Sequence, residues 1–160
     1  MIIVGYQGIG KSTMATSDWR CIDLESTCFR DRRNQFVRPN DWYVYYCQIA
    51  EDLSRQGYIV FVSSHEVVRN FLRDYCDEWT VCIYPSILLA DEWKQKLKER
   101  YQASQKDKDY RAWMNAEDRY RENITGLMMC GIPHVEIGRM DYNLADLVQT
   151  AQSAQPRHET

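Results

Sequence analysis

An apolar run opens the chain and leads directly into a glycine-rich turn. Residues 1–4 read Met-Ile-Ile-Val, and residues 5–12 read Gly-Tyr-Gln-Gly-Ile-Gly-Lys-Ser, which satisfies the spacing GxxxxGK[ST]. Apolar runs without alternation are typical of strands that are buried on both faces of a sheet. Glycine allows positive φ angles and a close approach to the backbone. The spacing therefore predicts a buried strand, a tight loop and a helix of about two turns over residues 11–18.

The same eight residues predict an anion site. Backbone N–H groups of such a loop turn inward around phosphate groups, and the positive end of the following helix adds to the attraction. Lys11 is expected to reach the β- and γ-phosphates of a nucleotide, and the Ser12 hydroxyl to hold Mg²⁺. We therefore expect ATP, or a closely related nucleotide, and Mg²⁺ as cofactors. The residues predicted to bind the nucleotide are Gly5, Gln7, Gly8, Ile9, Gly10, Lys11, Ser12 and Thr13.

Strand-like and helix-like segments alternate along the rest of the chain. Further strands are predicted over residues 20–24, 58–63, 80–84 and 134–137, with helices over 41–56, 66–75, 87–101, 110–130 and 144–152. This alternation is typical of a parallel sheet with helices on both faces. We expect an α/β three-layer sandwich of about five parallel strands, with a small helical lid, as one domain over residues 1–152. Residues 153–160 are expected to form a flexible tail.

The composition argues against several other classes of protein. The net charge of −3 disfavours nucleic acid as a stable partner. No apolar run approaches the roughly 20 residues that a membrane-spanning helix needs, and the strand-like run at residue 1 leaves no place for a signal peptide. The six cysteines form no CxxC pair, so we expect reduced thiols in the core rather than a zinc site. These signals predict a cytoplasmic protein without a membrane partner; they leave its oligomeric state open.

Charged residues follow the predicted second strand. Asp23 and Glu25 come first, and the next 13 positions include Arg30, Arg32, Arg33 and Arg38. Because arginine suits bidentate phosphate contacts, these four arginines are interpreted as an anion clamp just past the end of the strand. The alternative is a solvated loop. Asp23 and Glu25 are expected to hold a metal's water shell or the acceptor's hydroxyls, or to act as a general base; a turn or helix N-cap is the structural alternative.

Cations also flank a polar segment between two predicted helices. Residues 102–109 contain no apolar residue except Ala103, and the flanking cations are Lys94, Lys96, Lys98, Arg100, Arg111, Arg119 and Arg121. This arrangement predicts a lid over residues 100–111 that closes on a triphosphate, excludes water and stabilises charge on the transferring group. A helical hairpin with solvated charges is the alternative.

In the order and spacing of these elements, the chain resembles the nucleoside and nucleotide kinase branch of P-loop proteins, which includes adenylate, shikimate and gluconate kinases. The matching segments cover most of residues 1 to about 150; they are residues 5–12, Ile22-Asp23-Leu24-Glu25, Val62-Ser63-Ser64 through Arg69, and Ile83-Tyr84-Pro85 leading into 93–100. The resemblance implies an acceptor-binding arm over about residues 25–41, with an acceptor role for residues 30–38 and Arg69. It also implies a lid role for Arg100, Arg111, Arg119 and Arg121. The third strand departs from the pattern, because it ends in Ser63-Ser64-His65 without an acidic metal ligand.

The expected activity is transfer of the γ-phosphoryl group of ATP to a small anionic acceptor, with a nucleoside or deoxynucleoside monophosphate favoured. Expected catalytic residues are Lys11, Arg100, Arg111 and Arg119, and expected metal ligands are Ser12 and Asp23. The residues expected to bind the acceptor are Asp23, Glu25, Arg32, Arg33, Arg38 and Arg69. Two alternatives stay open: a kinase for a small hydroxyl metabolite with Asp23 as the base, and a nucleotide-binding switch or ATPase without an acceptor.

Overall fold

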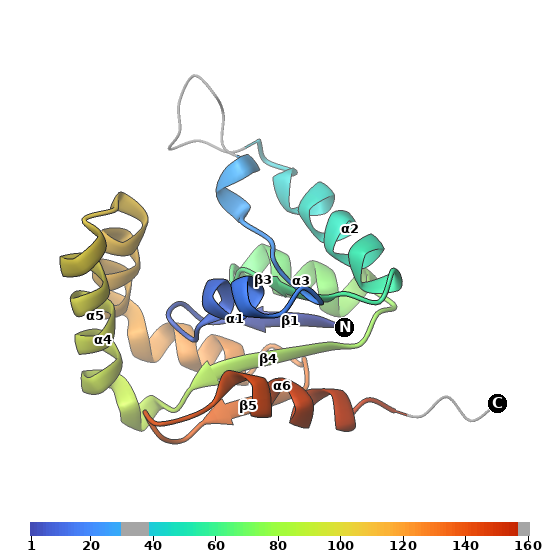
Figure 1. Cartoon of the computed structure of the whole chain (residues 1–160). Helices are drawn as coiled ribbons and strands as arrows, with labels where there is room; N and C mark the ends of the chain where they lie inside the picture. The colour runs from blue at the N-terminus through green and yellow to red at the C-terminus, as the bar shows by residue number, and fades with distance from the viewer. Residues whose placement is uncertain (30–38, 157–160) are drawn as a thin grey trace.

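The computed structural model describes residues 1–29 and 39–156, and these form an α/β fold around one five-stranded sheet (Figure 1). All four strand pairings are parallel, as the alternating pattern predicts, and the strand order is β2-β3-β1-β4-β5. The strands are β1 (Ile2–Gly5), β2 (Cys21–Asp23), β3 (Ile59–Val62), β4 (Thr80–Pro85) and β5 (His134–Ile137). The α-helices are α1 (Lys11–Ser17), α2 (Trp42–Arg55), α3 (Glu66–Tyr75), α4 (Ala90–Ser104), α5 (Asp107–Met128) and α6 (Leu144–Ser153), and short 3₁₀ turns span η1 (Ser26–Phe29) and η2 (Ile87–Leu89).

Strand β1 occupies the centre of the sheet. Its residues Ile2, Ile3 and Val4 are fully buried, and Ile3 aligns with Phe61 of β3 on one side and Val81 of β4 on the other. A strand in this position is covered on both faces, which explains its apolar run. Burying side chains of this size contributes roughly 1.5–3 kcal/mol each. The glycine-rich loop therefore starts from the most firmly packed strand of the sheet.

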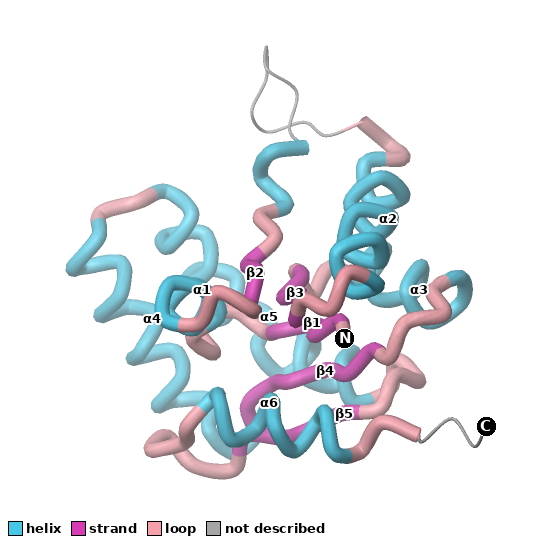
Figure 2. Tube along the Cα trace, turned by 45° about the vertical axis from the view of Figure 1, so that its right-hand side comes forward, coloured by secondary structure: helices cyan, strands magenta, loops and turns pink. Residues whose placement is uncertain are grey.

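Helices cover both faces of the sheet because crossovers between parallel strands are right-handed. The connection through α1 runs from β1 toward one edge, whereas those through α2, α3 and α5 run in the opposite direction and lie on the other face. Helix α2 packs against α3, and the side chain of Arg69 in α3 lies against Gly126 of α5. Helix α6 passes in front of β4 and β5 (Figure 2). The result is the expected succession of helix, sheet and helix.

Helices α4 and α5 form an antiparallel hairpin beside the sheet (Figure 1). Only Gln105 and Lys106 separate them, and Gln105 adopts a left-handed φ of 55° while its N–H donates to the carbonyl of Tyr101. The predicted polar flap over residues 102–109 is therefore mostly the ends of two helices. The contact that anchors this segment locally is polar, because Asp109 is buried.

No helix among residues 1–29 and 39–156 is long and apolar enough to span a membrane. Cys21, Cys47, Cys76, Cys82 and Cys130 carry free thiols, as expected for reduced core cysteines. Helix α6 ends at Ser153, which is the first residue of the predicted tail. Residues 157–160 of that tail lie outside the described part of the chain.

Candidate functional site

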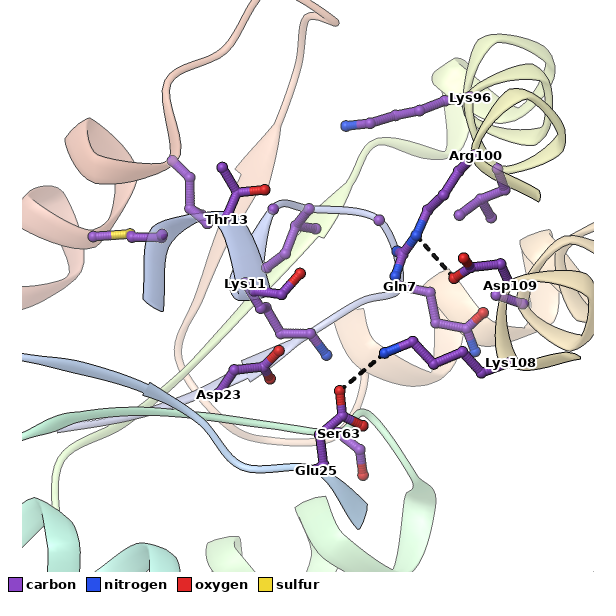
Figure 3. Close-up of a pocket in the computed structure, with 18 of the residues that line it drawn as sticks. Gln7, Lys11, Thr13, Asp23, Glu25, Ser63, Lys96, Arg100, Lys108 and Asp109 are labelled. Atoms are coloured by element: carbon purple, nitrogen blue, oxygen red, sulfur yellow. Dashed lines mark hydrogen bonds and ion pairs between the residues drawn. The ribbon is translucent and has the colours of Figure 1, made fainter. Parts of the chain in front are cut away.

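A cleft of about 1110 Å³ opens at the carboxyl ends of the strands. The connection after β1 runs toward one edge of the sheet, and the connection after the neighbouring β4 runs toward the other edge. Neighbouring strands with opposite connections form a topological switch point, and ligands of open α/β sheets bind there. Five segments line the cleft: residues 7–14 of the loop and α1, residues 23–27 at the end of β2, Ser63 and His65 after β3, the α4–α5 hairpin, and residues between 140 and 145 at the start of α6. Figure 3 shows side chains from these segments pointing into one space.

The loop between β1 and α1 has the backbone geometry of an anion-binding nest. Gly8 has a φ of 85°, and Gly10 is left-handed with φ 107° and ψ 20°. Such conformations turn successive N–H groups toward one concave side. Within the described residues, the N–H groups of Gly8, Gly10, Lys11 and Ser12 have no hydrogen-bond acceptor. The loop therefore presents unpaired donors to the cleft.

The side chain of Lys11 folds back over this loop. Its Nζ donates to the carbonyl of Gly5 at 3.0 Å. Burial lowers the pKa of Lys11, while the nearby carboxylates of Asp23 and Glu25 act in the opposite direction. Desolvation makes the ammonium charge unfavourable in this place without a neighbouring anion. An anionic ligand in the loop would add to the negative charge of Asp23 and Glu25 and favour the ammonium form further.

The carboxylates after β2 enter the cleft from the side opposite the hairpin. Asp23 lies close to Lys11 in Figure 3, and burial raises the pKa of Asp23 although Lys11 lowers it in part. Glu25 pairs with Lys108 of the hairpin, with 3.1 Å between the carboxylate oxygen and Nζ. The structure thus brings Asp23 and Glu25 to one wall, as the alternation along β2 predicts.

Tyr46 of α2 holds the ends of β2 and β3 together beneath this wall. Its hydroxyl donates to the carbonyl of Leu24 at 2.6 Å and accepts from the N–H of Ser63 at 2.9 Å. The Oγ of Ser63 is buried and has no hydrogen-bond partner among the described residues. It reaches the cleft beside Glu25 (Figure 3). The residue that follows β3 and reaches the cleft is therefore a serine, and not an aspartate or glutamate.

The hairpin supplies most of the cations of the cleft, namely Lys96, Arg100, Lys108 and Arg111. Arg100 is held by Asp109, with 2.9 Å between Nε and Oδ1, and Asp109 is only 4% exposed. Ser104 also donates to that carboxylate. A buried carboxylate with two partners fixes the direction of the guanidinium group, so Arg100 is presented to the cleft rather than left free in solvent.

Two of the predicted site arginines do not line the cleft. Arg119 lies in a separate hollow of about 470 Å³, 3.8 Å from Glu122. It follows Arg111 by eight residues, which is roughly 12 Å along α5 away from the hairpin tip. Arg69 donates to the carbonyl of Ser64 at 3.2 Å, and its guanidinium packs against Gly126. Arg30, Arg32, Arg33 and Arg38 lie outside the described residues, as does most of the predicted acceptor arm.

Other cleft residues were not assigned from the sequence. Tyr142, Asn143 and Asn115 line the cleft, and Lys96 and Lys108 face it from the hairpin. Tyr142 follows β5, so its place at the carboxyl end of a parallel strand was a usable signal. Asn115 follows Arg111 by four residues and thus shares its helix face. No metal-binding group of three or more His, Cys, Asp or Glu side chains occurs in the described part of the chain.

No protein-family model matches this chain. No curated protein shows significant sequence similarity to it.

Proposed function

We propose that this protein is a phosphotransferase that moves the γ-phosphoryl group of ATP to a small anionic acceptor. A nucleoside or deoxynucleoside monophosphate is the favoured acceptor. The observation that carries this proposal is the loop after β1, where unpaired N–H groups and Lys11 meet the cations of the hairpin in one cleft. Its volume of about 1110 Å³ exceeds the roughly 300–1,000 Å³ of most single-ligand pockets, which fits a donor and an acceptor together.

The donor side would be the phosphate-binding loop, with N–H groups around the β-phosphate and Lys11 beside the β- and γ-phosphates. Ser12 and Asp23 both line the cleft, and their side chains carry the oxygen atoms that Mg²⁺ prefers as ligands. They would bind the ion directly or through water. A small number of protein ligands is enough for Mg²⁺, because the ion commonly keeps several water ligands and binds the phosphates of the substrate. When bound there, the ion neutralises charge on the phosphates.

The hairpin would act as a lid. Arg100 is fixed by Asp109 and Lys108 reaches Glu25 across the cleft, so two cations stand above the loop. Cations held in place need no reorganisation when charge develops on the transferring group. Arg111 lines the same space. Catalysis would thus consist of alignment and electrostatic stabilisation, as is general for phosphoryl transfer.

One observation favours a hydroxyl acceptor as a second candidate. Asp23 lies at the carboxyl end of β2, and burial raises the pKa of its carboxyl group, which moves it toward the range of a general base. A phosphate acceptor is nucleophilic at neutral pH and needs no such base. Loss of turnover with a hydroxy compound in an Asp23→Asn variant would select this candidate.

Nucleotide binding is tested by thermal unfolding. ATP with Mg²⁺ should raise the melting temperature, because a ligand at 100 times its Kd stabilises the native state by about 2.7 kcal/mol. The shift should vanish in Lys11→Ala and shrink in Ser12→Ala. Lys106→Ala serves as the control, since Lys106 is exposed and lies outside the cleft. Equal shifts in the Lys11→Ala and Lys106→Ala variants would contradict the proposal.

A further inference from the structure

Two side chains from distant elements hold carbonyl groups of the loop. The indole Nε1 of Trp93, a fully buried residue of α4, donates to the carbonyl of Gln7 at 2.8 Å. The hydroxyl of Tyr142 lies 2.7 Å from the carbonyl oxygen of Ile9, to which it donates. These carbonyls belong to the peptide groups that precede Gly8 and Gly10. The two hydrogen bonds therefore orient the peptide groups on the N-terminal side of Gly8 and Gly10, the two glycines of the loop with positive φ.

The trans peptide geometry converts these contacts into a direction for the N–H groups. All described peptide bonds are trans, and in a trans peptide the C=O and N–H point to opposite sides. A carbonyl of Gln7 that is turned toward Trp93 thus turns the N–H of Gly8 the other way. The carbonyl of Ile9 and the N–H of Gly10 are related in the same manner. The N–H groups of Gly8 and Gly10 are two of the four N–H groups of this segment that have no acceptor among the described residues.

Lys96 completes the arrangement. Its Nζ donates to the hydroxyl of Tyr142 at 2.9 Å and lies 4.4 Å from the ring centroid of Trp93. The rings of Trp93 and Tyr142 stack with centroids 5.9 Å apart and planes at 25°. The Tyr142 hydroxyl accepts from Lys96 while it donates to the loop, and hydrogen bonds in such a chain strengthen one another. Figure 3 shows the Lys96 side chain extending over the cleft from α4.

We propose that Trp93, Tyr142 and Lys96 form a clamp that pre-organises the loop for a polyphosphate. The clamp consists of the two hydrogen bonds to the loop carbonyls and the Lys96–Tyr142 bond. Trp93 and Tyr142 are positioning residues, since they act through the N–H groups of Gly8 and Gly10. This inference rests on the proposed function and adds the residues that give its loop the binding-competent shape before the ligand arrives.

Inorganic tripolyphosphate with Mg²⁺ tests the clamp, because this probe has no base or sugar to bind elsewhere. Titration calorimetry should show about tenfold weaker binding for Trp93→Phe and for Tyr142→Phe, each of which loses its hydrogen bond to a loop carbonyl and keeps a ring. Tyr142→Phe also loses the hydrogen bond from Lys96. Trp113→Phe and Tyr101→Phe are matched controls on the same hairpin. The indole of Trp113 donates to Glu117, away from the loop, and neither ring lines the cleft. Both controls should bind as the unaltered protein does.

A double-mutant cycle separates the clamp from a direct contact between Lys96 and phosphate. If Lys96 acts through Tyr142, Lys96→Met should weaken tripolyphosphate binding less in the Tyr142→Phe background than alone. Strictly multiplicative losses would remove Lys96 from the clamp. The {¹H}–¹⁵N nuclear Overhauser effects of the Gly8 and Gly10 amides provide a second readout, which should fall in Trp93→Phe and Tyr142→Phe without ligand. A role in packing alone would leave these values unchanged.

The outcomes distinguish the clamp from the proposed function. If Trp93→Phe and Tyr142→Phe bind tripolyphosphate normally while Lys11→Ala does not, the clamp is refuted and the phosphate site stands. If Lys11→Ala also binds normally, the phosphate site is refuted together with the clamp. Should Trp93→Phe fail to fold, Tyr142→Phe decides, because Tyr142 is only partly buried.

Discussion

Lys108, in the first turn of α5, lies 3.1 Å from Glu25, which follows β2 on the opposite side of the cleft. This ion pair connects the tip of the hairpin to the wall that carries Asp23. The two side chains are 42% and 43% exposed, so water screens their attraction. Such a contact connects the hairpin to the sheet without fixing it there, which suits the proposed role of the hairpin as a lid.

We predict that this pair contributes little to stability. A double-mutant cycle of Glu25→Gln and Lys108→Gln, read by chemical denaturation, should give a coupling of roughly 0–1 kcal/mol that decreases with added salt. The KM of the acceptor should nevertheless rise in both variants, because both residues line the cleft. A salt-independent coupling well above that range would show a rigid hairpin and contradict the account of a lid.

The glycines of the chain allow a graded test of the loop geometry. Gly138 has ordinary φ and open space around an added Cβ, Gly57 has a φ of +95° and open space, and Gly8 combines a φ of +85° with Leu97 Cδ2 at 2.9 Å from that Cβ. Gly138→Ala should change the free energy of unfolding by less than about 0.5 kcal/mol. Gly57→Ala should lose about 1–2 kcal/mol, and Gly8→Ala about 1–3 kcal/mol more.

Chemical denaturation of the three variants measures this order directly. The Gly57→Ala variant is the control for Gly8→Ala, because it shares the left-handed backbone but not the contact with α4. Equal losses of unfolding free energy in Gly57→Ala and Gly8→Ala would show that a Cβ at residue 8 does not collide with Leu97 of α4.

Asp109 should be the most important polar residue of the hairpin for stability. It is 4% exposed, accepts a hydrogen bond from Ser104 and forms an ion pair with Arg100, so Asp109→Ala removes both interactions together with the buried carboxylate. We expect a loss of about 1–3 kcal/mol in the free energy of unfolding. The exposed Asp118 of the same helix is the matched control, and Asp118→Ala should stay within about 0.5 kcal/mol. Similar losses in the two variants would contradict the buried role of Asp109.

Much of the sheet could be predicted from the sequence because each strand carries its own signal. The run Ile2-Ile3-Val4 and the run Ile59–Val62 are apolar on both faces, and their strands lie inside the sheet. The predicted bounds of β5 and α3 agree with the structure, and the other strands differ by one or two residues. The eight-residue loop motif carries equally local information, and residues 7–12 of it line the cleft.

The parts that could not be predicted depend on contacts between distant residues. Trp93 meets Gln7 across 86 positions, and Tyr142 meets Ile9 across 133, so no local pattern reveals that they hold the loop. Asp109 belongs to a polar segment of the sequence, whereas in the structure it is buried and pairs with Arg100 and Ser104. Arg119 shares the charge of Arg111 but lies too far along α5 to reach the cleft. Charge and spacing alone do not distinguish these cases.

Alkaline pH should destabilise the protein through Tyr142 and Tyr84. Burial raises the pKa of each to about 12, whereas tyrosine in an unfolded chain titrates near 10. The folded state thus retains these protons more tightly, and the free energy of unfolding falls as the pH rises from about 10 to about 12. Below about pH 10 the contribution is complete.

Denaturation curves across this range, compared with those of Tyr142→Phe, measure the effect. The variant cannot ionise at residue 142, so its stability should fall less steeply above about pH 10, by at most about 2–3 kcal/mol over the range. The variant and the unaltered protein should show parallel curves at lower pH. Identical slopes above about pH 10 would mean that Tyr142 is not buried in the folded protein.

The central claim is tested most directly by the release of ADP from ATP and Mg²⁺ in the presence of candidate acceptors. The panel should contain nucleoside and deoxynucleoside monophosphates and small hydroxy acids, with Lys11→Ala as the inactive control and Lys106→Ala as the active one. We predict that ADP release requires a monophosphate, that the phosphorylated acceptor appears in equal amount, and that Lys11→Ala abolishes both. ATP turnover that is independent of every acceptor, or no turnover with any of them, would contradict the assignment as a phosphotransferase.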